Sequence, residues 1–289
     1  MQIGAHALVF TGSFDKAGLT HAISETKNAG FDLIEIPLMD PAGFDRGLAA
    51  QLLKEYDLAA TASLGLGEST DLTSADPAVA AAGEKMLTEC LEIVHAIGGR
   101  HLCGVIYSAM KKYLAPPSTA GRASSAAALH RLAERAADLD IHLSLEVVKR
   151  YETNLLNTGR QALAFLDEVD HPNVSVHLDT YHMNIEESDL FSPVLDVADR
   201  LGYVHIGESH RGYLGSGTVD FDAFFRGLAR IDYDGPVVFE SFSSAVVDQD
   251  LSRMLGIWRN LWQDSGDLAV HANAFIRGRL HGVDSIAQH

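Results

Sequence analysis

Short apolar runs and longer amphipathic segments alternate along the chain from one end to the other. The apolar runs are rich in β-branched and aliphatic residues and read as nearly continuous, which is typical of parallel strands that are covered on both faces. The strand candidates are residues 3–10, 33–37, 59–66, 101–107, 142–147, 174–179, 203–206 and 236–240. This pattern predicts a parallel sheet whose successive strands are joined by helices.

The segments between these runs have the periodicity of helices. In one of them, "TSADPA" at 73–78 supplies Ser and Asp for an N-cap and a proline for the first turn, and Gly98 and Gly99 follow as a C-cap. The helix candidates lie near 20–29, 45–56, 76–97, 120–139, 158–169, 189–201, 221–231 and 249–264. Eight strand–helix units predict an α/β protein with a (β/α)8 TIM barrel.

An open doubly wound sheet is the alternative fold. It is disfavoured because no strand–turn–helix carries G-x-G-x-x-G, and "GYLGSG" at 212–217 has the glycines without that spacing. We expect one barrel domain over 1–289, with 266–289 as a C-terminal helical extension outside the eight units. That amphipathic extension either closes the barrel or contacts another subunit.

Composition limits the partners and the compartment. The formal charge of −17 opposes binding to nucleic acid and to anionic membranes. Cys90 and Cys103 lie in apolar segments, where free buried thiols are the usual state, and this fits a reducing cytosol. The start of the chain lacks a basic signal-peptide region, and no apolar run approaches the length of a membrane span. We therefore expect a cytoplasmic protein with no nucleic-acid or membrane partner.

Acidic residues and one histidine lie at the ends of four predicted strands. In a (β/α)8 barrel the site lies where the strands end, and successive strands end at Glu146, Asp179, His205 and Glu240. Three carboxylates buried together repel one another unless a cation neutralises them. An oxygen-rich donor set with one imidazole suits Mn²⁺, Mg²⁺ or Co²⁺ better than a structural zinc. Any one of these residues alone is more often a solvated strand-end group, so the prediction rests on all four.

Three further residues lie close to the quartet in the sequence. His182 follows Asp179 by three positions, so both side chains can point into one mouth, although a surface histidine is an equally good interpretation. Arg211 lies in a loop long enough to fold over a ligand, and Glu152 is a candidate by position alone.

Four motifs resemble those of a known enzyme family. "LSLEVVKRYETN", "VHLDTYHMNIEE", "VHIGESHRG" and "VVFESF" are similar to the site motifs of the ketose 3-epimerases, the D-tagatose, D-allulose and L-ribulose 3-epimerases of the xylose-isomerase-like TIM barrels. The resemblance covers nearly the whole chain. "GVIYSAMKKY" and "IGESHRGYLG" are closer to the L-ribulose and D-allulose enzymes than to the D-tagatose enzyme.

This resemblance implies an isomerase that epimerises a free ketose at C3 through a cis-enediolate. It implies Glu146, Asp179, His205 and Glu240 as ligands of Mn²⁺, with Co²⁺ or Mg²⁺ substituting, and Glu146 and Glu240 as the acid/base pair. It also implies that the O1 and O2 end of the sugar is bound by Glu152, His182 and Arg211. The family suggests a homodimer or homotetramer.

The far end of the sugar has weaker candidates. The first strand end and the fourth loop differ from the D-tagatose enzymes, in which more aromatic contacts are expected. The residues proposed to meet the sugar there are Phe10, Leu66, Tyr107 and Met110, each equally plausible as packing at the barrel rim.

Other functions remain as alternatives. A ketose–aldose isomerase of the hydroxypyruvate isomerase type shares the barrel and would shift the proton between C1 and C2. An apurinic endonuclease shares the "DTYH" signature, but "EIPL", "ASLGL" and "VIYSA" lack the histidines that its zinc cluster needs. A non-catalytic sugar-binding barrel would need no opposed carboxylates. The absence of a glycine-rich phosphate site disfavours a phosphorylated substrate, although Arg211 and Lys149 could bind phosphate.

Overall fold

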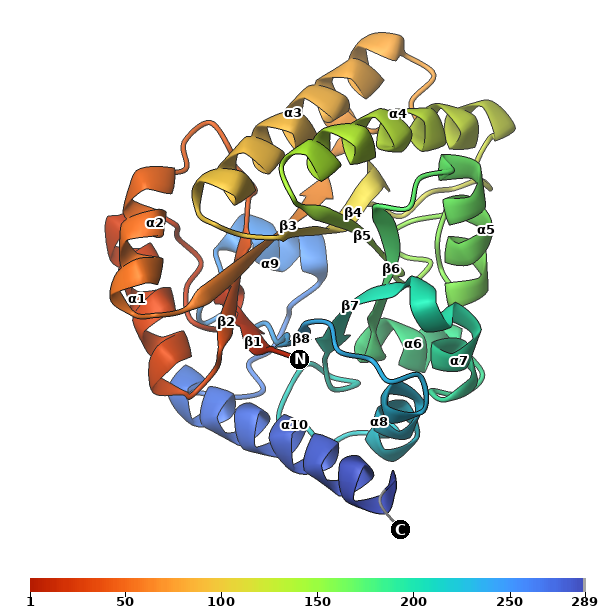
Figure 1. Cartoon of the computed structure of the whole chain (residues 1–289). Helices are drawn as coiled ribbons and strands as arrows, with labels where there is room; N and C mark the ends of the chain where they lie inside the picture. The colour runs from red at the N-terminus through yellow and green to blue at the C-terminus, as the bar shows by residue number, and fades with distance from the viewer. Residues whose placement is uncertain (288–289) are drawn as a thin grey trace.

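A closed barrel of eight parallel strands forms the centre of the computed structural model, which describes residues 1–287 (Figure 1). Each strand pairs with its neighbours in sequence, and the last pairs with the first. The strands are β1 (Ile3–His6), β2 (Leu33–Pro37), β3 (Ala59–Leu66), β4 (His101–Ala109), β5 (His142–Glu146), β6 (Val174–Asp179), β7 (Leu201–Ile206) and β8 (Val237–Phe239). The TIM barrel predicted from the sequence is confirmed.

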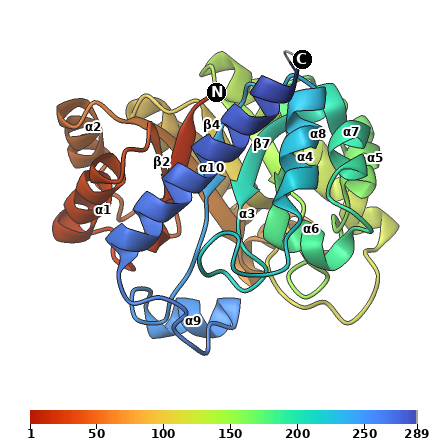
Figure 2. The same cartoon turned by 90° about the horizontal axis from the view of Figure 1, so that it is seen from below.

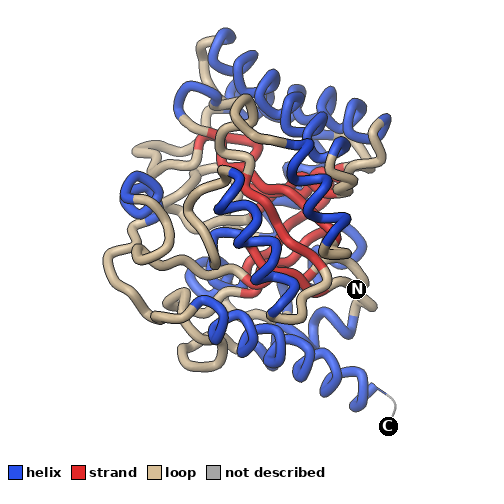
Figure 3. The backbone as a smooth tube through the Cα atoms, turned by 90° about the vertical axis from the view of Figure 1, so that its left-hand side faces the viewer, coloured by secondary structure: helices blue, strands red, loops and turns tan. Residues whose placement is uncertain are grey.

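Helices enclose the strands on the outside of the barrel (Figures 1 and 3). Side-chain caps begin several of them: Asp15, Asp45, Asp76 and Ser118 each accept a hydrogen bond from a backbone N–H of the first turn. The α-helices are α1 (Lys16–Asn28), α2 (Arg46–Glu55), α3 (Pro77–Ala96), α4 (Thr119–Asp138), α5 (Gly159–Val169), α6 (Thr180–Glu186), α7 (Ser192–Val197), α8 (Phe221–Arg230), α9 (Gln249–Leu255) and α10 (Ser265–Ala287).

Several predicted elements differ in extent, and three of them are clearly shorter than predicted. The strand over 3–10 ends at His6, whose side chain caps the 3₁₀ turn η1 (Ala7–Val9). The helix over 189–201 shrinks to α7 and the 3₁₀ turn η3 (Ala198–Arg200). The helix over 249–264 stops at Leu255, because Gly256 adopts the left-handed conformation of a C-cap.

The eighth position in the helical ring is filled by α10. It packs against α8, β1 and β8 through the buried residues Leu268, Ala269, Ala272 and Ile276 (Figure 1). The short α9 lies instead at the end of the barrel opposite the N-terminus (Figure 2).

Cys90 and Cys103 are buried free thiols, as expected. No helix in residues 1–287 combines the length and apolar character needed to cross a bilayer.

An irregularity between β3 and β4 shapes one wall of the barrel mouth. The strand register shifts between Gly65 and Leu66, so that Leu66 pairs with Ala109. Gly104 of β4 has a φ of +110°, and a Cβ there would lie 2.4 Å from the backbone oxygen of Leu64. Only glycine combines that φ with so close an approach of two strands.

Gly104→Ala is therefore expected to lower the free energy of unfolding by about 1–3 kcal/mol, the usual cost of a strained backbone conformation. The matched control is Gly278→Ala in α10, because no described atom lies within 4 Å of a Cβ built at that position. The control should leave stability unchanged or raise it by up to about 1 kcal/mol, through helix propensity. Urea unfolding of both variants checks this, and equal stability of the two would contradict it.

Candidate metal centre and active site

The last residues of four strands meet at the carboxyl-terminal mouth of the barrel. Glu146 ends β5, Asp179 ends β6, His205 lies near the end of β7, and Glu240 directly follows β8. One ligand atom from each residue lies within 4.8 Å of the others, and all four side chains are buried. His205 Nδ1 lies 3.6 Å from Glu146 Oε1 and 3.5 Å from Glu240 Oε1. The structure thus brings together the four residues that the strand ends indicated.

The three carboxyl groups of this cluster are buried close together, and this shifts their pKa values. Burial, together with the carboxylates of Glu240 and Asp179, raises the pKa of Glu146 to about 8. Burial also raises the pKa of Asp179 to about 6, although the Arg211 guanidinium opposes it. At Glu240 burial is outweighed by Arg211 and His205, so the pKa of that carboxyl lies below its usual value. A divalent cation among these oxygens would offset the repulsion that burial amplifies.

The donor atoms fit such a cation. Within residues 1–287, neither His205 Nδ1 nor Asp179 Oδ2 has a hydrogen-bond partner, although Asp179 Oδ2 has an ion-pair contact with Arg211, and both atoms are buried. His205 directs its other nitrogen, Nε2, to Glu35 Oε2 at 2.7 Å, which leaves Nδ1 free to donate its lone pair. Three carboxylates and one imidazole form a donor set suited to Mn²⁺, Mg²⁺ or Co²⁺.

Arg211 supplies positive charge beside two of the carboxylates of the cluster. Its guanidinium lies 3.0 Å from Asp179 Oδ2 and 2.6 Å from Glu240 Oε2, and it is stacked over the Tyr181 ring at 4.0 Å. The residue has a φ of 61°, and its carbonyl accepts a hydrogen bond from Ser241 Oγ. This strained backbone conformation is held by surrounding structure and points the side chain into the mouth.

His182 presents a neutral N–H to the same mouth. Its Nδ1 accepts a hydrogen bond from the backbone N–H of Lys149 at 3.1 Å, so the ring proton lies on Nε2. That Nε2 lies 3.7 Å from carboxylate oxygens of Glu146, Glu152 and Asp179. Burial, Arg211 and Lys149 hold the pKa of His182 well below its usual value, so the ring stays a neutral donor.

Glu152 is fixed by Lys149, which the sequence indicated only as a possible phosphate ligand, and Lys149 is fixed by Tyr181, which the sequence did not single out. Lys149 Nζ lies 2.7 Å from Glu152 Oε1 and donates a hydrogen bond to the Tyr181 hydroxyl at 2.9 Å. Lys149 follows Glu146 by three positions, and Tyr181 lies inside the "DTYH" motif. Their only signal in the sequence is this closeness to the ligand candidates.

Two cavities meet at the quartet. One has a volume of about 310 Å³ and is lined by polar side chains that include Lys149, Glu152, His182 and Arg211. The other has a volume of about 390 Å³ and a largely apolar wall. Glu146, Glu240 and Met110 line both cavities, so a ligand at the quartet would extend a polar end into one and an apolar end into the other.

Three residues proposed for the far end of the sugar lie elsewhere. Phe10, Leu66 and Tyr107 are buried, and none of them lines either cavity. The apolar cavity is lined instead by residues two positions earlier in the chain, namely Leu8, Leu64 and Val105. Two departures from regular strands lie close to these positions: β1 ends at His6, and the register of β3 and β4 shifts after Gly65. Tyr107 packs on Phe165 and donates a hydrogen bond to the Glu146 carbonyl.

Known proteins resemble this chain both in sequence and in fold. Residues 23–265 match the model of the xylose isomerase-like TIM barrel. The chain is 62% identical to a ketose 3-epimerase of Arthrobacter globiformis over the full length of both, and 56% identical to an L-ribulose 3-epimerase of a Methylomonas strain over 96% of this chain and 98% of that one. A crystal structure of D-allulose 3-epimerase from Methylomonas in complex with D-allulose superposes with a TM-score of 0.95, at 56% identity over 96% of this chain and 97% of that chain.

These matches span the barrel and every strand end that contributes to the quartet. The family inferred from the sequence is confirmed by relatives far more similar than chance allows, and those relatives are named as epimerases. The chain therefore belongs to the ketose 3-epimerases, isomerases of the xylose isomerase-like TIM barrel family.

Proposed function

We propose that this protein epimerises free ketoses at C3 with the help of a divalent cation held by Glu146, Asp179, His205 and Glu240. The main support is the placement of two buried carboxylates, Glu146 at the end of β5 and Glu240 directly after β8, at 3.6 and 3.5 Å from one imidazole nitrogen of His205. Two opposed proton carriers suit inversion at a carbon next to a carbonyl.

The cation, when bound, supplies Lewis acidity that polarises the C2 carbonyl oxygen and stabilises the enediolate. One glutamate takes the proton from one face of C3, and the other returns a proton to the opposite face. The first glutamate ends protonated and the second ends ionised, so the pair must exchange protons with solvent before the next turnover. Either glutamate serves as the base, depending on which epimer is bound.

The polar cavity suits the O1 and O2 end of the sugar. Its Glu152 carboxylate accepts hydrogen bonds from hydroxyl groups, and the His182 N–H and the Arg211 guanidinium donate to oxygens that gain negative charge. C4 to C6 then extend into the apolar cavity beyond Met110. Relatives named for L-ribulose, D-psicose and D-allulose support a free ketopentose or ketohexose as the substrate.

Product analysis tests this function against a ketose–aldose isomerase. The protein is incubated separately with L-ribulose, D-allulose and D-tagatose, and the products are separated by chromatography. The proposal predicts L-xylulose, D-fructose and D-sorbose, and the relative rates rank the substrates. Formation of aldoses would favour an isomerase of the hydroxypyruvate type, and no conversion of any sugar would contradict both functions.

His182→Leu is expected to lower kcat by about 10²-fold, the usual loss when one donor to a developing oxyanion is removed. His182→Gln is the matched variant, because its amide can place an N–H near the same point, and it should recover part of the loss. Steady-state kinetics of both variants at saturating cation check this. Equal kcat for His182→Leu and the wild type would remove His182 from the proposal.

We further infer Mn²⁺ as the resident cation, with Co²⁺ or Mg²⁺ substituting, in a cytoplasmic homodimer or homotetramer. The donor set supports this group of cations, and the family resemblance supports the assembly. Elemental analysis of the purified protein decides the first point, and light scattering after size-exclusion chromatography decides the second.

A further inference from the structure

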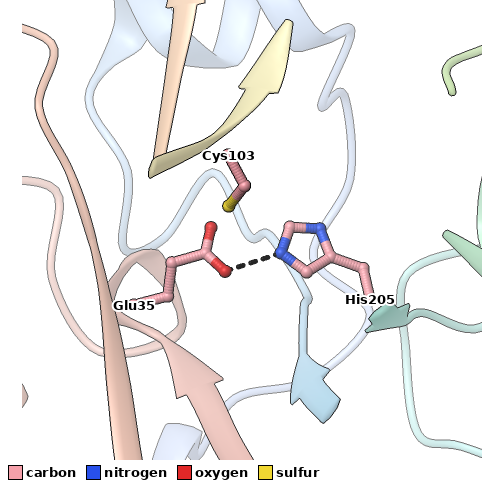
Figure 4. Close-up of side chains that lie close together, drawn as sticks. All are labelled: Glu35, Cys103 and His205. Carbon is pink, nitrogen blue, oxygen red and sulfur yellow. Dashed lines mark hydrogen bonds and ion pairs between the residues drawn. The ribbon is translucent and has the colours of Figure 1, made fainter. Parts of the chain in front are cut away.

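A buried carboxylate lies directly beneath the quartet. Glu35 of β2 has no exposed surface, and its Oε2 accepts a hydrogen bond from His205 Nε2 at 2.7 Å (Figure 4). The same oxygen accepts a second hydrogen bond from the Tyr203 hydroxyl at 2.7 Å. His205 therefore uses one ring nitrogen to bind Glu35, and its other ring nitrogen faces Glu146 and Glu240.

A chain of hydroxyl groups holds Glu35 in place. The Tyr203 oxygen lies 2.6 Å from Thr61 Oγ1, and because Tyr203 donates its proton to Glu35, Thr61 must donate to Tyr203. On the other side, His6 Nε2 lies 3.4 Å from Glu35 Oε1. A fully buried carboxylate is costly unless it is paired and hydrogen-bonded, and these contacts offset that cost.

Cys103 also lies beside Glu35 and His205, and the three residues present donor atoms within 4.8 Å of one another (Figure 4). They do not suit a second cation, however. Glu35 and His205 already use the facing atoms in their mutual hydrogen bond, and the Cys103 thiol is directed to the Ala62 carbonyl. Burial raises the pKa of Cys103 well above its usual value, so its sulfur stays a poor ligand.

We propose that Glu35 is a positioning residue, which acts through His205 by holding the imidazole in the tautomer whose Nε2 carries the proton and whose Nδ1 lone pair points into the quartet. The carboxylate also makes that imidazole a stronger donor to a cation, as carboxylate partners of metal-binding histidines do. This proposal rests on the proposed function only in requiring that the quartet bind a cation, and its main test, the affinity for Mn²⁺, needs no turnover.

The test compares Mn²⁺ affinity by calorimetric titration of cation-stripped wild type, Glu35→Gln and Tyr203→Phe. Glu35→Gln keeps the size and one acceptor oxygen but removes the charge, and it should weaken Mn²⁺ binding by about 10–100-fold, the usual effect of removing such a partner. Tyr203→Phe removes one hydrogen bond to the same carboxylate and leaves the charged partner of His205 in place, so its Kd should rise clearly less than that of Glu35→Gln.

Two further measurements separate positioning from a merely structural role. The thermal unfolding midpoints of the cation-stripped wild type and Glu35→Gln should agree to within a few degrees. At saturating Mn²⁺ the KM of Glu35→Gln for ketose should match that of wild type. The wild type alone gives an independent check: with 15N-labelled histidine and bound Mg²⁺, NMR should show His205 protonated at Nε2 and not at Nδ1.

Unchanged Mn²⁺ affinity in Glu35→Gln would overturn the proposal, as would a proton on Nδ1 of His205 in the Mg²⁺-bound wild type. If both variants lose affinity and stability in parallel, Glu35 is a structural residue only. If the wild type binds no Mn²⁺, the cation site of the proposed function fails and this inference fails with it. If the wild type binds Mn²⁺ and Glu35→Gln binds it equally well, the inference alone fails.

Discussion

Replacement of Glu146 or Glu240 by glutamine is expected to lower kcat for ketose epimerisation by at least about 10³-fold, since a general acid or base contributes about 10²–10⁴-fold and each residue is also a candidate ligand. Glutamine keeps the size of the side chain and one donor oxygen, so the loss reports the missing proton carrier more than a collapse of the mouth. Steady-state rates at saturating Mn²⁺ measure it.

The two variants should also differ from each other. If one glutamate serves each face of C3, then in D2O each variant retains exchange of the C3 proton in only one epimer of the pair, and the two variants retain it in opposite epimers. The control is Glu68→Gln, because this exposed carboxylate pairs with Lys111 at 2.7 Å outside both cavities and should leave kcat unchanged. A variant that keeps more than a tenth of wild-type kcat would remove that glutamate from the acid/base pair.

Removal of the cation is expected to abolish turnover, and Mn²⁺ is expected to restore it. Without a cation, Glu146, Asp179 and Glu240 present only carboxyl groups within one small buried space, and these cannot polarise the C2 carbonyl as a cation would. Binding should also stabilise the fold, by about 4 kcal/mol when the free cation exceeds Kd a thousandfold.

Asp179→Asn serves as the comparison for this stabilisation. It removes one candidate ligand charge and leaves Glu146 and Glu240 in place, so its thermal unfolding midpoint should rise less on addition of Mn²⁺ than that of the wild type. Protein shown by elemental analysis to be free of divalent cations, yet turning over at the wild-type rate, would exclude a cation from the mechanism.

The sequence predicted the barrel because its strands are nearly continuous apolar runs. The bounds 33–37, 59–66 and 174–179 agree with β2, β3 and β6, where Pro, Gly or a polar residue ends the run. The last helix was misplaced because 249–264 and α10 are both amphipathic, and helical periodicity does not show which of them packs on the barrel. Gly256 was the available signal that the first of these ends early.

The site was predictable to the extent that it depends on strand ends. Glu146, Asp179, His205 and Glu240 could be found because parallel strands of a barrel end at one mouth. Glu35 could not be found in this way, since it lies in the middle of β2 and contacts His205 across the barrel interior. Leu64 and Val105 were missed because the register shift between β3 and β4 has no clear signature in a single sequence, and Leu8 was missed because the first strand was predicted to run past His6.

The proposed function requires the protein to move a proton at C3 of a ketose in a reaction that depends on a cation. The most direct measurement follows D-allulose and L-ribulose by NMR in D2O with cation-stripped protein, before and after Mn²⁺ is added. The proposed function predicts deuterium at C3 and the appearance of the 3-epimer only after Mn²⁺ is added. Deuterium at C1 or C2 with an aldose product, or exchange at C3 without any divalent cation, would contradict it.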